Sequence, residues 1–91
     1  MSTRVVNIHK SNHHDVYIGR PSIWGNPFST KDGDKRFAVI EAYRMYFLTR
    51  IRDDDDFRAK TEALKGKILG CHCLPKLCHG SVIAAWCNGE L

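Results

Sequence analysis

Residues 67–73, KILGCHC, followed by LPKLC at 74–78 and SVIAAWC at 81–87, decide the fold of this chain. The first segment is an apolar run of the length typical of a buried strand, and the second contains a proline that favours a loop. The third is apolar enough for a packed helix, which Asn88-Gly89 would end. This part of the chain therefore predicts a strand, a loop and a helix in that order.

Two shorter strands are predicted near the N-terminus. Residues 5–8 and 15–18 are rich in β-branched side chains, and the polar stretch 9–14 between them is typical of a connecting loop. Residues 19–33 contain two prolines and three glycines, which predicts an ordered but irregular loop. Such loops often carry binding residues because the surrounding scaffold holds them in place.

A long helix is predicted from a cap at Asp34 to about Ile51. Apolar side chains recur at helical spacing along it and make one stripe, which consists of Phe37, Ile40, Tyr43, Phe47 and Ile51. We expect this stripe to face the core, because an amphipathic helix buries its apolar side.

Four consecutive aspartates at 53–56 precede a short helical pattern that reaches Leu64 and stops at Gly66. Adjacent carboxylates in one loop do not give the varied geometry that a bound cation needs. Aspartate is, however, a preferred residue at a helix start, where negative charge also suits the helix dipole. We therefore expect Asp55 or Asp56 to be an N-cap.

The composition narrows the class of protein. At 91 residues the chain has the length of one domain, and its elements predict a single α/β domain over 1–91, with a short sheet packed against about three helices. No apolar run approaches the roughly 18 residues of a membrane span, and residues 1–4 lack a signal peptide's apolar stretch. We expect a cytoplasmic protein with no membrane partner. The net charge of +4 favours an anionic partner, either a phosphate-bearing small molecule or nucleic acid.

The cysteines are too close together in the sequence for a disulfide to close a long loop, so we expect reduced thiols. Side chains alternate along a strand, which places Cys71 and Cys73 on the same face. Cys78 and His79 follow at the start of the last predicted helix, where the helix dipole favours a thiolate. Cys78 is therefore the cysteine expected to be ionised.

Two functional interpretations of this block concern metal and catalysis. Cys71, Cys73 and Cys78, with His79 or His72 as the fourth ligand, can supply a tetrahedral set for zinc. The protein would then be a structural domain that acts as a protein interaction module or a host-factor inhibitor. In an enzyme, Cys78 or Cys73 would be the nucleophile of a transferase or hydrolase, with His79 as its base. Simple packing of the cysteines as small buried side chains is a further alternative.

The interpretation that we favour is an anion cradle, which requires no cofactor. Backbone amides at the start of the last helix, around Gly80 and Ser81, would bind a phosphate, with Lys76 and His79 beside it. The second part of the cradle is the loop at 19–33. Arg20 suits a phosphate and Asn26 can recognise polar edges.

Trp24 in the same loop has two alternative roles. Its indole can stack on a base or sugar. It can equally plug a self-packed loop, since proline turns around a tryptophan close a small core well.

The chain resembles domain-of-unknown-function family 4326, small proteins of bacteria and their phages. The matching motifs are VYIGRPSIWGNPF at 16–28, AYRMY at 42–46 and LKGKILGCHCLPKLCHG at 64–80. The chain departs from the family pattern at His72, where an aromatic residue is usual, and at Ser81, where an aspartate is common. The resemblance implies no settled activity. The strand that ends in cysteine, followed by Cys78-His79 at a helix start, also resembles a second group of small α/β domains, which implies a shared pocket design.

These observations predict that the Arg20 to Asn26 loop and the Cys73 to Ser81 loop face each other across a shallow anion pocket. The expected ligand is a nucleotide or a nucleic-acid phosphate. A host protein bound through an exposed apolar patch is an alternative partner.

Overall fold

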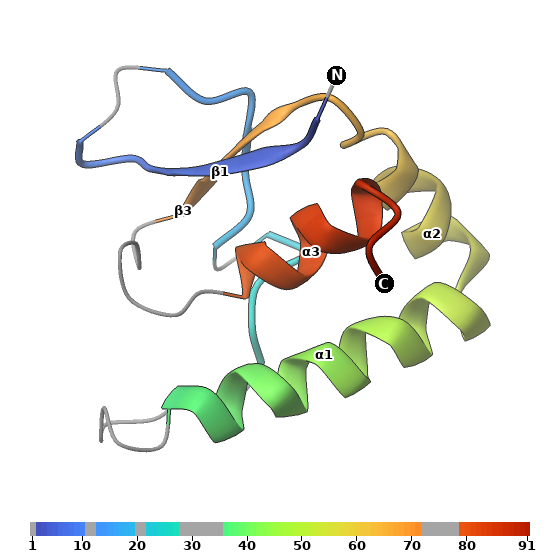
Figure 1. Ribbon diagram of the computed structural model, residues 1–91. Coiled ribbons are helices and arrows are strands. Elements are labelled where there is room, and N and C mark those ends of the chain that lie inside the picture. The colour runs from blue at the N-terminus through green and yellow to red at the C-terminus, as the bar shows by residue number, and fades with distance from the viewer. Residues whose placement is uncertain (1, 11–12, 20–21, 28–35, 72–78) are drawn as a thin grey trace.

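The computed structural model describes residues 2–10, 13–19, 22–27, 36–71 and 79–91. The described elements are three strands and three helices (Figure 1): β1 (Arg4–Asn7), β2 (Val16–Tyr17), α1 (Arg36–Asp53), α2 (Asp55–Glu62), β3 (Ile68–Cys71) and α3 (Gly80–Cys87). This confirms the predicted α/β class, with a short sheet packed against three helices. No helix among these residues is both long and apolar enough to cross a membrane.

The sheet is parallel and has the order β1-β3-β2. The two N-terminal strands therefore do not pair with each other, because β3 lies between them. On β3, Gly70 makes room for the residues that connect β1 to β2. A Cβ at Gly70 would lie 2.7 Å from the His14 ring and 2.8 Å from Ile8 Cγ2.

The opposite face of the sheet holds the core. Leu69 and Cys71 are almost fully buried, and Val5 and Val16, both in register with Leu69, pack against the same cluster. α3 packs on β1 and β3. On its other side, α3 contacts α1 through Trp86, whose ring centroid lies 6.2 Å from that of Phe47.

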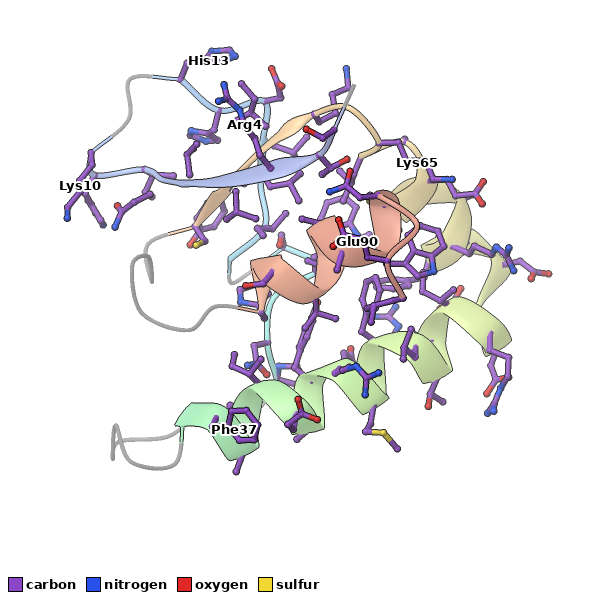
Figure 2. All side chains as sticks on the ribbon, viewed as in Figure 1. Arg4, Lys10, His13, Phe37, Lys65 and Glu90 are labelled. Carbon is purple, nitrogen blue, oxygen red and sulfur yellow. The ribbon has the colours of Figure 1, made fainter. Side chains whose placement is uncertain are left out.

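The predicted stripe of α1 is buried over most of its length. Tyr43 and Phe47 are fully enclosed and Ile51 is buried, but Phe37 is 67% exposed, so its predicted place in the core is wrong. Figure 2 shows Phe37 at the end of α1 farthest from α2. The periodicity is correct, and the first turn of the helix extends beyond the elements that cover Tyr43.

The aspartate run caps a helix, as expected, but at a different residue. Asp54 is the N-cap of α2, and its Oδ1 accepts a hydrogen bond of 3.0 Å from the backbone N–H of Phe57. The predictions of Asp55 or Asp56 are wrong, because α2 begins at Asp55. The neighbouring Asp53 pairs with Arg52.

The bounds of β3 and α3 can be compared with those predicted from the sequence. α3 begins at Gly80, one residue before the predicted start. β3 is described as far as Cys71, and the last two residues of the predicted strand lie outside the described part of the chain.

Candidate functional site

The carboxyl ends of the three parallel strands lie at one edge of the sheet. Figure 1 shows β1 and β3 ending, and α1 and α3 beginning, on the same side of the molecule. Helix N-termini carry partial positive charge, and open α/β sheets bind ligands outside the carboxyl ends of their strands. This side of the molecule is therefore the candidate site.

At this edge His79 connects the two blocks of sequence that contain the predicted site residues, 17–28 and 70–81. Its Nε2 lies 2.8 Å from the backbone carbonyl oxygen of Ile18, which follows β2. Because a carbonyl can only accept, Nε2 carries the proton and donates it. The ring is 6% exposed and packs edge-on against Tyr43, with ring centroids 5.0 Å apart. The start of α3 thus contacts the residue that follows β2, and the Nε2 of His79 is already engaged. The predicted pocket between the Arg20 to Asn26 loop and the Cys73 to Ser81 loop includes residues outside the described part of the chain and stays a prediction.

Gly80 lets the start of α3 approach the sheet closely. A Cβ at this position would lie 2.7 Å from Ile18 Cδ1 and 3.1 Å from Val5 Cγ1. The carbonyl of His79 accepts hydrogen bonds from the N–H groups of Val82 and Ile83, at 3.0 and 3.4 Å. Gly80 therefore has a packing role, and Ser81 beside it is exposed on the first turn of α3.

Trp24 is held from two sides. Its indole N–H donates a hydrogen bond of 3.0 Å to Thr61 Oγ1 of α2, and its backbone carbonyl accepts one of 2.8 Å from the Tyr43 hydroxyl of α1. The side chain packs against the buried cluster. These contacts favour the role of a plug for Trp24. Asn26, two residues later, is partly buried.

The described cysteines have the surroundings of packed side chains. Cys71 is 1% exposed within the core. Burial raises the pKa of the Cys87 thiol, whose Sγ lies 3.8 Å from the Thr61 carbonyl oxygen. Within the described residues no three histidine, cysteine or acidic side chains are grouped so that they could hold a metal ion.

Several of the predicted site residues lie outside the described residues. They are Arg20, Cys73, Lys76 and Cys78. The zinc set and the catalytic pair therefore stay predictions.

Tyr43 also lies at the site, although its spacing predicts only a core residue. Its place in the AYRMY motif was the available signal that it also links the two blocks.

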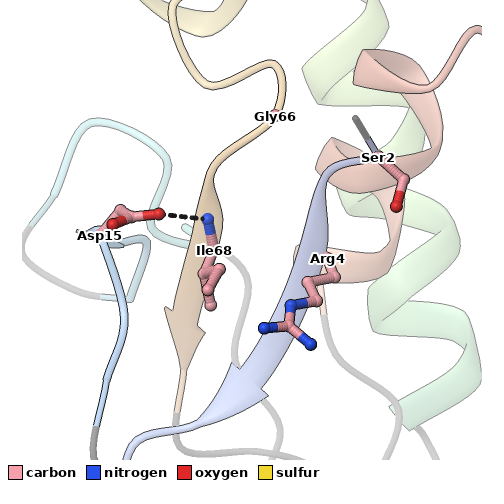
Figure 3. Close-up of a pocket in the computed structure, with 5 residues that line it drawn as sticks. All are labelled: Ser2, Arg4, Asp15, Gly66 and Ile68. Carbon is pink, nitrogen blue, oxygen red and sulfur yellow. Dashed lines mark hydrogen bonds between the residues drawn. The ribbon is translucent and has the colours of Figure 1, made fainter.

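An open pocket of about 420 Å³ lies at the opposite edge of the sheet, where β1 and β3 begin (Figure 3). It is lined by Ser2, Arg4, Asp15, Gly66 and Ile68. The Asp15 carboxylate accepts a hydrogen bond of 2.8 Å from the N–H of Ile68 and lies 3.1 Å from His13 Nε2. Asp15 therefore fixes the start of β3.

The fold and the candidate site define a small parallel α/β domain in which the N-terminus of α3 packs against β1 and against Ile18, which follows β2. The chain belongs to the family described as domain of unknown function DUF4326, whose model matches residues 4–89. It is 46% identical over 81 residues to an uncharacterised 12.4 kDa protein from the nrdA–td intergenic region of enterobacteria phage T4. That match covers 89% of this chain and 73% of the phage protein. No solved structure matches the chain.

Proposed function

We propose that this domain binds the phosphate of a nucleotide or a nucleic acid at the carboxyl edge of its sheet, beside the start of α3. The observation that carries the proposal is the hydrogen bond from His79 to the Ile18 carbonyl. It holds the start of α3 against Ile18, which follows β2. The partial positive charge of a helix N-terminus then lies next to Ile18, two residues before Arg20 in the sequence.

The charges of the described residues support an anion at this edge. Lys10 is exposed in the turn that follows β1, where its N–H bonds to the Asn7 carbonyl. Asp15 lies at the opposite edge, and the aspartate run lies where α1 meets α2. A phosphate at the start of α3 would therefore be distant from these carboxylates.

The proposal assigns different roles to the block residues. His79 positions the loop through Ile18, and Gly80 permits the close approach of α3 to the sheet. Ser81 is exposed on the first turn of α3, and Arg20 and Lys76 would supply the charge. No step of this proposal needs a nucleophile or a metal.

Binding is tested by titrating nucleotides, short single strands and duplexes at two salt concentrations. Arg20→Ala should weaken binding by about 1.5–3 kcal/mol, the usual range for a hydrogen bond to a charged group. Arg52→Ala is the matched control, because it removes the same charge at the far end of α1, where Arg52 pairs with Asp53. A steep loss of affinity with salt would indicate nucleic acid, and a shallow one a single phosphate.

The alternatives give different results in the same samples. If none of these ligands binds the parent protein, the proposal is wrong. Elemental analysis would favour the zinc interpretation if the protein carries one equivalent of zinc that Cys73→Ser removes. Rapid, selective alkylation of Cys78 would favour the thiol enzyme.

A further inference from the structure

Helix α1 exposes two large apolar side chains that are not covered by the core. Phe37 is 67% and Met45 is 65% exposed, and eight residues separate them, which is about 12 Å along the axis. In Figure 1 the side of α1 that faces away from α3 is not covered by any described element. Large apolar side chains exposed on one helix point to a partner that covers them.

The residues on this side follow a symmetric pattern. Phe37, Glu41, Arg44 and Leu48 are spaced by four, three and four residues, the spacing of a coiled-coil seam. At 3.6 residues per turn they lie within a stripe about 60° wide. Reversing the helix direction exchanges Phe37 with Leu48 and Glu41 with Arg44. The stripe is therefore complementary to its own antiparallel copy.

We propose that α1 pairs with α1 of a second copy of this chain, antiparallel about a two-fold axis that passes between Glu41 and Arg44. Phe37 then packs on Leu48 of the partner subunit, and Glu41 forms a salt bridge with the partner's Arg44. Because the axis is two-fold, each contact occurs twice. Met45 lies beside the seam and is covered by the same contact.

The charges of Glu41 and Arg44 favour a second copy of this chain as the partner of the stripe. Among the described residues the ion pairs use other side chains, and neither Glu41 nor Arg44 has an ion-pair partner in that part of the chain. Leu48 is partly buried against the core and adds its remaining surface to the stripe. Another protein would have to present apolar, acidic and basic groups in this order, whereas a second copy presents them by symmetry.

The proposed dimer is weak and depends on concentration. One helix pair buries less than the roughly 1,200–2,000 Å² of a standard stable interface. Sedimentation velocity over a wide concentration range should therefore show monomer and dimer in exchange for the parent protein.

Charge reversal tests the register. Glu41→Arg places two arginines opposite each other, and Arg44→Glu does the same with two glutamates, so each variant alone should dimerise at least about tenfold more weakly. The double variant Glu41→Arg with Arg44→Glu restores both pairs and should dimerise like the parent. An equimolar mixture of the two single variants should form a heterodimer, since both of its pairs are then opposite in sign.

Three results would overturn the proposal. They are a parent that remains monomeric at its solubility limit, single variants that dimerise as the parent does, and a mixture that does not recover the dimer. The first of these would assign the stripe to a different partner. Thermal melting of each variant checks the fold, and the mixture adds an internal control because it contains only chains that fail on their own.

Discussion

Individual residues at the candidate site stabilise the fold, in addition to any role they have in binding a ligand. His79 uses Nε2 to hold the Ile18 carbonyl, which limits it as a general base to its other nitrogen. Gly80 touches Ile18 and Val5 so closely that a side chain would have to displace one of them. A motif residue such as His79 can thus have a structural role. For each substitution at the site, the free energy of unfolding and the affinity for a ligand must therefore be measured separately.

Gly80→Ala should destabilise the protein by about 1–2 kcal/mol, because an extra methyl in a packed core costs more than the better helix propensity of alanine returns. Urea unfolding measures the loss. The double variant with Ile18→Val identifies the cause, since valine lacks the Cδ1 atom that lies 2.7 Å from the added methyl. Ile18→Val should cost less in the Gly80→Ala background than alone. Equal costs would show that the contact is not responsible.

Trp24→Phe should lower the free energy of unfolding by about 1–2 kcal/mol, because it removes the hydrogen bond to Thr61 and part of the packed indole. The Thr61 hydroxyl keeps its bond to the Phe57 carbonyl, so no buried donor loses its partner. If Trp24 is a plug, affinity for a phosphate ligand should stay within about twofold of the parent, since no hydrogen bond to the ligand is lost. Lost affinity with unchanged stability would instead support stacking on a base.

At the scale of elements, the sequence predicts what local chemistry determines. Periodic apolar residues place α1, and Asn88-Gly89 correctly ends α3. The order of the strands is not predictable in this way, because β1 and β2 each pair with a strand more than fifty residues later in the chain. The N-cap of α2 is ambiguous because every member of a run of four aspartates can cap a helix. The predicted burial of Phe37 is wrong for a related reason, because periodicity does not indicate where the elements that cover a helix end.

The candidate site is partly predictable for the same reason. Motif residues indicate which loops to consider, and the structure adds a contact between His79 and Ile18. The Ile18 group that His79 holds is a backbone carbonyl, which every residue has, so no side chain marks it in the sequence. Tyr43 has the spacing of a core residue, and its hydroxyl bond to Trp24 follows only from the packing of α1 on the loop.

At the scale of the whole molecule, the amino and carboxyl ends of the strands differ in the contacts they make. At the amino edge, Thr3 and Asn88 join the two ends of the described chain through bonds of 2.8 and 2.9 Å, and Asp15 holds the start of β3. The starts of α1 and α3 lie on the side of the carboxyl edge, where the candidate site is (Figure 1). Since the Asp15 carboxylate is part of the structural edge, acid should act on stability through it.

The stability of the protein should fall as the pH falls through the range in which these carboxylates titrate. The backbone N–H of Ile68 lowers the pKa of Asp15, and that of Phe57 lowers the pKa of Asp54. A pKa that is lower in the folded state than in the unfolded chain stabilises fully above the unfolded value, about 3.9. That contribution is lost as the pH drops through the folded value. Urea midpoints between neutral pH and about pH 3 should therefore decline most steeply below about pH 4.

Asparagine at these positions keeps an oxygen that can accept the same N–H but cannot be protonated in this range, and it caps helices well. Asp15→Asn and Asp54→Asn should each flatten the acid limb of the stability curve, and the double variant should flatten it further. The slope of stability against pH counts the difference in bound protons between the unfolded and folded states, so a smaller slope means that a titrating group was removed. An acid limb as steep in the double variant as in the parent would assign the effect to other carboxylates, and Asp15 would then hold β3 without linking its stability to pH.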